Sequence, residues 1–129
     1  MGNKLLLLVD DEEDWLLLLE RFLVSENFSV LTARNCREAL EIVSRDRPNC
    51  VIVDAKIGEE NGGEICRRIK ASPELRGIPV IMLSGGIDAA QDCGPDACIC
   101  KSDGLGCVLA TLRKVLAEIS KKPGRGSRE

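Results

Sequence analysis

The sequence predicts an α/β fold in which helices cover both faces of a doubly wound, five-stranded parallel sheet. Two short apolar runs, Leu5–Val9 and Val51–Val53, are bounded by polar residues, as is typical of strands buried on both faces of a parallel sheet. Segments with helical apolar spacing alternate with the strand-like runs, which favours right-handed crossovers. We assign residues 3–120 to one domain and residues 121–129 to a flexible tail or linker.

The first half of the chain is predicted to form two strand–helix units. Leu5–Val9 is the first strand, and Asp11–Asp14 place acids in the first helical turn, where the helix dipole favours negative charge. Phe28–Ala33 is the second strand, and Asn35 caps the second helix, which ends before Pro48. The two buried stripes are expected to comprise Trp15, Leu18, Leu19, Phe22 and Leu23, and then Ala39, Leu40 and Val43.

The second half continues the alternation. Cys50–Val53 and Ile78–Leu83 are predicted strands, separated by a loop over Gly58–Gly63 and a helix that presents Ile65 and Ile69. A short fifth strand and a final helix follow, and the segment between the last two strands contains several glycines and a proline, so its helix is expected to be short or irregular. These predictions rest on Ala97–Cys100, on the apolar positions 105, 108, 109, 112, 115, 116 and 119, and on Gly85, Gly86, Gly94 and Pro95.

Composition excludes several classes of function. The chain has 129 residues, a net charge of −3 and no histidine or tyrosine, so proton transfer or metal binding falls to carboxylate, lysine, hydroxyl or thiol groups. Basic residues concentrate only over residues 121–128, which disfavours nucleic-acid binding by the folded body. The apolar run Leu5–Val9 is too short to span a membrane and lacks signal-peptide flanks, so a cytoplasmic protein is expected.

Polar side chains follow four of the predicted strands. Asp10 and Asp11 end the first strand, Asp54 the third, Ser84 the fourth, and Lys101 the fifth. Because the carboxyl ends of parallel strands meet at one edge of the sheet, these side chains are expected to converge there. Clustered carboxylates at such a site favour a hard cation such as Mg²⁺.

This ordered set of five side chains resembles the receiver domain of two-component response regulators. The resemblance covers roughly residues 3–120 and includes Asn61-Gly62 where the family commonly has Asp-Gly. It implies the flavodoxin-like strand order 2-1-3-4-5. It also implies that Asp54 accepts phosphate, that Asp11 binds Mg²⁺ directly and Asp10 through water, and that the backbone carbonyl of Lys56 joins Asp54 as a metal ligand.

The same resemblance implies roles for Ser84 and Lys101, which would each contact a phosphoryl oxygen. The implied function is a phosphorylatable switch with self-catalysed phosphotransfer and dephosphorylation, and not a metabolic enzyme. Its expected partners are a histidine kinase or phosphotransfer protein and an output partner or attached effector domain, with a homodimer as a further option. Phosphoryl transfer needs positioning and charge neutralisation, which Mg²⁺, an ammonium and a hydroxyl supply without histidine.

The sequence departs from the family around the fifth strand. Ser102 follows Lys101 where receivers usually have a proline after a cis peptide, and Cys98 replaces the usual Tyr or Phe. A cis bond without proline costs about 2.5–4 kcal/mol, which favours a trans peptide and a re-routed loop; in that case the placement of Lys101 would differ from the family's. Cys93, Cys98, Cys100 and Cys107 are numerous enough for a four-thiolate zinc site, but they lack a Cys-x-x-Cys spacing. This favours small buried hydrophobes, with a redox-sensing thiol pair as the next alternative.

Three alternatives remain at this point. A pseudo-receiver would keep the pocket and act as a constitutive interaction module. A small phosphohydrolase of the haloacid-dehalogenase type would need Asp-x-Asp at the first strand, whereas Glu12 stands two places after Asp10. A flavodoxin-like cofactor carrier is disfavoured because clustered acids repel a phosphate and stacking aromatics are few.

Overall fold

A five-stranded parallel sheet forms the centre of the computed structural model, which describes residues 3–84 and 94–121, with side chains to Glu118. Its strand order is β2-β1-β3-β6-β7, so the predicted order 2-1-3-4-5 is confirmed for the five sheet strands in chain order. The strands are β1 (Leu5–Val9), β2 (Ser29–Ala33), β3 (Cys50–Asp54), β6 (Val80–Ser84) and β7 (Ala97–Cys100).

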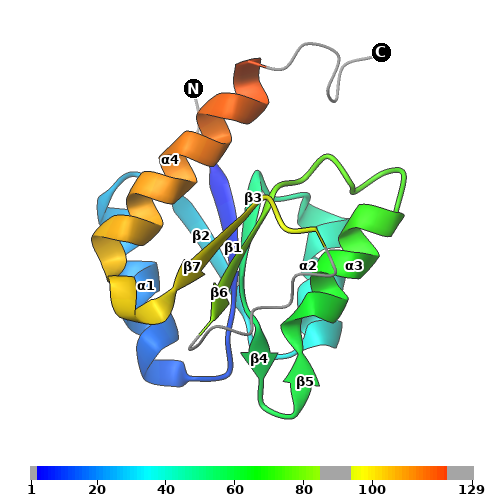
Figure 1. Ribbon diagram of the computed structural model, residues 1–129, viewed down its shortest axis with the longest axis horizontal. Helices are drawn as coiled ribbons and strands as arrows, with labels where there is room; N and C mark the ends of the chain where they lie inside the picture. The colour runs from blue at the N-terminus through cyan, green and yellow to red at the C-terminus, as the bar shows by residue number, and fades with distance from the viewer. Residues whose placement is uncertain (1–2, 85–93, 122–129) are drawn as a thin grey trace.

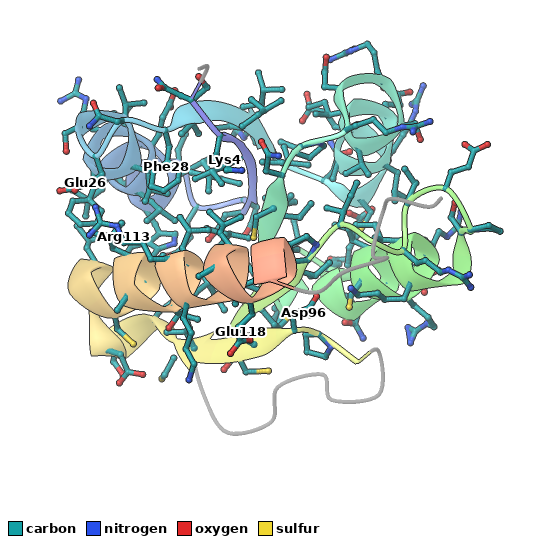
Figure 2. The ribbon with its side chains drawn as sticks, turned by 90° about the horizontal axis from the view of Figure 1, so that it is seen from above. Lys4, Glu26, Phe28, Asp96, Arg113 and Glu118 are labelled. Carbon is teal, nitrogen blue, oxygen red and sulfur yellow. The ribbon has the colours of Figure 1, made fainter. Side chains whose placement is uncertain are left out.

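Helices cover both faces of the sheet, as Figure 1 shows. Helices α1 (Glu13–Ser25) and α4 (Leu105–Lys121) lie on one face, and α2 (Cys36–Asp46) and α3 (Gly62–Ala71) lie on the other. Arg113 of α4 and Glu26 at the end of α1 form an ion pair of 3.0 Å, and Figure 2 shows both side chains at the same side of the molecule. Among the described residues, no helix is long and apolar enough to cross a bilayer.

Two apolar cores explain why the central strands are continuously hydrophobic. Val51 and Val53 of β3 face the core beneath α2 and α3, whereas Cys50 and Ile52 face the core beneath α1 and α4. Side chains alternate between the faces of a strand, so a strand covered on both sides needs apolar residues at every position. All five residues of β3, including the terminal Asp54, are buried.

The predicted buried stripe of α1 needs one correction. Leu19 and Leu23 are buried as expected, but Leu18 is 51% exposed and Leu16 takes the inward position. Trp15 and Phe22 are half-buried and pack at the border of the core. Four consecutive leucines, Leu16–Leu19, leave the rotational phase of a helix undetermined, because every face carries an apolar side chain.

The structure also adds an element at the carboxyl edge of the sheet. Strands β4 (Lys56–Ile57) and β5 (Glu60–Asn61) pair as an antiparallel hairpin where the sequence predicts a loop. Gly58 within its turn has φ +60°, which glycine adopts readily. Ile57 is only 2% exposed, so the hairpin is anchored to the core rather than projecting freely from it.

The last helix follows the predicted apolar stripe where side chains are described. Val108, Leu112 and Val115 are buried, and the half-buried positions are Leu105, Leu109 and Leu116. The expected short or irregular helix between the last two sheet strands falls largely on residues 85–93, which lie outside the described residues.

Replacing Asn35 with alanine is expected to lower the free energy of unfolding by about 1 kcal/mol. Asn35 Oδ1 accepts a hydrogen bond from the Glu38 N–H at 2.8 Å and so caps the start of α2. Chemical denaturation of the wild type, Asn35→Ala and the cap-retaining Asn35→Asp measures this loss. An Asn35→Asp variant as unstable as Asn35→Ala would contradict the capping role.

Candidate functional site

A cavity of about 360 Å³ opens at the carboxyl edge of the sheet, with Asp11, Glu12, Asp54, Lys56, Gly58 and Lys101 in its lining. Strands β1 and β3 are parallel neighbours, with Val9 paired to Val53. Asp10 and Asp54, the next residues, therefore emerge side by side at the same edge. The convergence predicted from the strand ends is present.

The ammonium of Lys101 lies among three carboxylates. Its Nζ is 2.9 Å from Asp10 Oδ2, 3.0 Å from Asp54 Oδ2 and 2.8 Å from Glu12 Oε1. Among the described residues every peptide bond is trans, including Lys101–Ser102. The peptide is thus trans, and Lys101 still lies beside Asp10 and Asp54, with a short 3₁₀ turn over Lys101–Asp103 beginning at the pocket.

Burial and ion pairing shift the pKa values of Asp10, Glu12 and Lys101. Asp10 is 2% exposed, and this burial raises its pKa, opposed by the Glu12 N–H at 3.0 Å and by Lys101. For Lys101, burial alone would lower the pKa, but close contacts with the carboxylates of Glu12, Asp10 and Asp54 raise it well above its ordinary value. The hydrogen bond from Lys101 lowers the pKa of Glu12. Lys101 is therefore a permanent cation here, facing acids.

The acidic group fits a hard divalent cation. One carboxylate oxygen from each of Asp10, Glu12 and Asp54 lies within 4.8 Å of the others. Asp10 Oδ2 is buried and, among the described groups, receives no well-directed hydrogen bond, although Lys101 Nζ is near. Carboxylate oxygens that face one another in this way are the ligand type that Mg²⁺ takes in proteins.

The other predicted site residues, Asp11, Lys56 and Ser84, lie in the cavity lining or at a neighbouring strand end. Asp11 is exposed and lines the cavity, and its Oδ2 lies 3.7 Å from where a Cβ on Gly58 would stand. The Lys56 side chain is exposed, and its N–H donates to Asp54 Oδ1 at 3.3 Å. Ser84 is 9% exposed at the end of β6 and pairs with Cys100, the residue before Lys101.

Sequence reasoning missed two residues at the pocket, Glu12 and Trp15. Glu12 takes part in the acidic group, and the Trp15 ring centroid lies 5.5 Å from Lys101 Nζ. The run Asp10-Asp11-Glu12-Glu13-Asp14 signals acids at the start of a helix but does not show which of them turn toward the pocket.

The described cysteines differ in how far their side chains are buried. Cys98 is exposed on β7, so the prediction of a small buried hydrophobe is wrong there, and Cys100 and Cys107 are half-buried. Cys50 and Cys66, for which no role was predicted, are buried. Within residues 3–84 and 94–118, the acidic group of Asp10, Glu12 and Asp54 is the single cluster found with metal-binding spacing, so the thiols described there form none. Cys93 lies outside the described residues.

Alkylation of Cys36 at pH 8 is expected to be about a hundredfold slower than that of a thiol with a pKa of 9.0. Burial, and then a hydrogen bond with Glu60, raises the pKa of Cys36 to about 11, so the thiolate fraction falls correspondingly. Peptide mass spectrometry after timed iodoacetamide exposure measures the rate, which should rise about tenfold for each pH unit while the pH stays well below 11. Glu60→Gln should accelerate it; fast alkylation of native wild type at pH 8 would contradict the prediction.

Comparison with known proteins agrees with this fold. Residues 6–102 match the family model of the response regulator receiver domain. Sporulation initiation phosphotransferase F of Bacillus subtilis is 33% identical over 92 residues, which cover 71% of this chain and 74% of that protein. Response regulator MprA of Mycolicibacterium vanbaalenii is 29% identical over 126 residues, which cover 94% of this chain but 54% of MprA. The chain thus spans about half the length of that relative.

Solved structures give the same result. The signal receiver domain of a signal transduction histidine kinase from Syntrophus aciditrophicus superposes with a TM-score of 0.85 at 27% identity, covering 98% of this chain and 99% of that one. A CheY-like receiver domain protein from Methanospirillum hungatei has a TM-score of 0.85 at 24% identity, over 93% and 98% of the two chains, and supports the fold alone. The chain belongs to the family of response regulator receiver domains, the signalling modules of two-component systems.

Proposed function

We propose that this receiver domain accepts a phosphoryl group on Asp54. The observation that carries the proposal is the position of the Asp54 carboxylate: it ends β3 inside the cavity, 3.0 Å from the Lys101 ammonium and within one acidic group with Asp10. Attack by an Asp54 oxygen forms the new O–P bond as the bond from phosphorus to the donor breaks. The ammonium of Lys101 stabilises negative charge on the transferring group.

Mg²⁺ would be held at the same edge of the sheet. Asp10 and Asp54 supply carboxylate oxygens, exposed Asp11 lies in the cavity lining, and the backbone carbonyl of Lys56 is the proposed neutral ligand. When bound, the cation neutralises charge on the phosphoryl oxygens and orients them for in-line transfer. The buried Asp10 oxygen without a well-directed hydrogen bond supports this assignment.

Ser84 is proposed to donate its hydroxyl to a phosphoryl oxygen. Its residue ends β6, the strand next to β3, and Leu83 pairs with Asp54. Ser84 stands one position beyond the residue paired with Asp54 and is 9% exposed, so its hydroxyl would be largely withdrawn from bulk water. Ser84 therefore complements Lys101, since each would contact a different oxygen of the group on Asp54.

The proposed donor is the phosphohistidine of a histidine kinase or phosphotransfer protein. The relative from Bacillus subtilis is itself named a phosphotransferase, and the structural neighbour from Syntrophus aciditrophicus is the receiver part of a histidine kinase. Residues 3–120 would form the switch, and phosphorylation would change its affinity for an output partner, an attached effector or a second copy of the chain. The switch would act in the cytoplasm, where these kinases present their phosphohistidine.

Incubation with acetyl phosphate and MgCl₂, followed by mass spectrometry of the intact protein, tests this function. A mass gain of one phosphoryl group that depends on MgCl₂ would support a phosphoacceptor. An unchanged mass with folded protein would instead support the pseudo-receiver alternative, which the exposed thiol of Cys98 at the usual aromatic position favours. Steady release of phosphate from a generic phosphate ester would revive the phosphohydrolase alternative.

A further inference from the structure

The ammonium of Lys101 is held from two sides of the pocket. Asp10 and Asp54 bind it from the strand ends. The start of α1 binds it from the other side, through Glu12 Oε1 at 2.8 Å and through the ring of Trp15, whose centroid is 5.5 Å from Nζ. An ammonium over an indole ring is attracted to its negative face.

The backbone of Glu12 is held by two hydrogen bonds, whereas its side chain is mostly exposed. Its N–H donates to Asp10 Oδ1 at 3.0 Å, and its carbonyl accepts from the Leu16 N–H at 3.0 Å. Its side chain is 65% exposed, whereas the side chains of Asp10 and Asp54 are 3% and 11% exposed. The carboxylate of Glu12 can therefore follow a displaced Lys101, while the two aspartates are confined to the pocket.

The ring of Trp15 gives the ammonium a second contact, and packing against the core holds this ring in place. Glu12 is the N-cap of α1 and Trp15 lies in its first turn, so both contact the ammonium from the start of this helix. The half-buried indole packs against the core that α1 and α4 cover. The ring is thus fixed by the core and does not depend on Lys101 for its position.

We propose that Glu12 is a positioning residue for phosphoryl transfer, which holds the Lys101 ammonium over Trp15 when Asp10 and Asp54 are engaged by a divalent cation. This inference rests on the proposed function. Because like charges repel, we expect the Lys101 ammonium to move away from Asp10 and Asp54 when Mg²⁺ binds these two carboxylates. Glu12 belongs to the same acidic group, but the cation ligands proposed above are the three aspartates and the Lys56 carbonyl. Glu12 is then the carboxylate that remains to keep the flexible lysine side chain at the pocket, beside the phosphoryl position and out of bulk solvent.

Intrinsic fluorescence reports the contact directly, because Trp15 is the single tryptophan and the chain has no tyrosine. Lys101→Met defines the emission of Trp15 without an ammonium. Without metal, Glu12→Gln should emit nearly as the wild type does, since Asp10 and Asp54 still hold Lys101. At saturating MgCl₂ the wild type should keep its emission, whereas Glu12→Gln should shift to the Lys101→Met value.

Glu13→Gln is the matched control, because Glu13 carries the same charge one residue away and pairs with Arg34 at 3.0 Å. It should follow the wild type at every MgCl₂ concentration. The inference is overturned if the wild type itself shifts to the Lys101→Met value, if MgCl₂ leaves Glu12→Gln unshifted, or if Glu12→Gln and Glu13→Gln respond alike.

A kinetic measurement separates this inference from the proposed function. Phosphorylation of Glu12→Gln by acetyl phosphate at saturating MgCl₂ should be slower than wild type by roughly threefold to tenfold, and Glu13→Gln should be unchanged. Equal rates for Glu12→Gln and wild type would overturn the positioning role while leaving Asp54 as acceptor. A wild type that gains no phosphoryl group would refute the proposed function, and the emission series would still decide whether Glu12 holds Lys101.

Discussion

Asp54→Asn is expected to abolish phosphorylation of the chain by acetyl phosphate and MgCl₂. The substitution keeps the size of the side chain at the end of β3 but replaces the attacking carboxylate with an amide, which is neutral and a poor nucleophile. Because Asp54 is buried beside Lys101 at 3.0 Å, no exposed carboxylate substitutes for it in the same position. Intact-protein mass spectrometry should show a full loss of the phosphoryl adduct.

Asp46→Asn is a suitable control for that loss. Asp46 is an exposed carboxylate at the end of α2, paired with Arg45 at 2.9 Å, and precedes the start of β3 rather than its carboxyl end. Its removal should leave the phosphoryl adduct unchanged. An adduct that persists in folded Asp54→Asn, with peptide mapping to Asp10 or Glu12, would contradict the assignment of Asp54.

Gly62→Ala is expected to lower the free energy of unfolding by about 2–4 kcal/mol. A Cβ at Gly62 would overlap the carbonyl oxygen of Asp54 and lie 2.9 Å from the carbonyl carbon. Backbone cannot turn aside as a side chain does, so α3 or the end of β3 has to shift. The Gly62 N–H, which donates to the Ala55 carbonyl at 2.8 Å, would be strained at the same time.

Gly106→Ala provides the comparison within the same fold. Gly106 also lies near the start of a helix, but a Cβ there would meet no atom within 4 Å. Alanine should therefore be neutral or stabilise by up to about 1 kcal/mol. Urea denaturation of both variants measures the contrast, and a Gly62→Ala protein as stable as the wild type would contradict the close approach.

The fold was largely predictable because the central strands leave little ambiguity. Runs such as Leu6–Val9 are buried on both faces, so their composition alone indicates a covered parallel strand. The phase of α1 was not predictable, because apolar residues occupy every position over Leu16–Leu19. The β4–β5 hairpin was also missed, since two-residue strands carry no periodic signal.

The pocket was predictable to the extent that strand ends determine it. Asp10, Asp54 and Lys101 meet because three parallel strands deliver them to one edge of the sheet. Glu12 and Trp15 belong to the start of α1, and their contacts depend on the angle at which that helix leaves β1. The 3₁₀ turn over Lys101–Asp103, which follows β7 with a trans peptide, was likewise not predicted, since a three-residue turn carries no periodic signal.

The three-carboxylate contact of Lys101 also has a consequence for assembly of the sheet edge. Lys101 comes 89 residues after Glu12 and directly follows β7, an edge strand that pairs with β6 alone. A slip of β7 by one residue would expose Ile99, turn Cys98 inward and carry the ammonium about 3.3 Å away from the acids. The acids left behind would then repel one another without a counter-charge. The ion pairs of Lys101 therefore favour the native register of β7 over a register shifted by one residue, which backbone hydrogen bonding alone would tolerate.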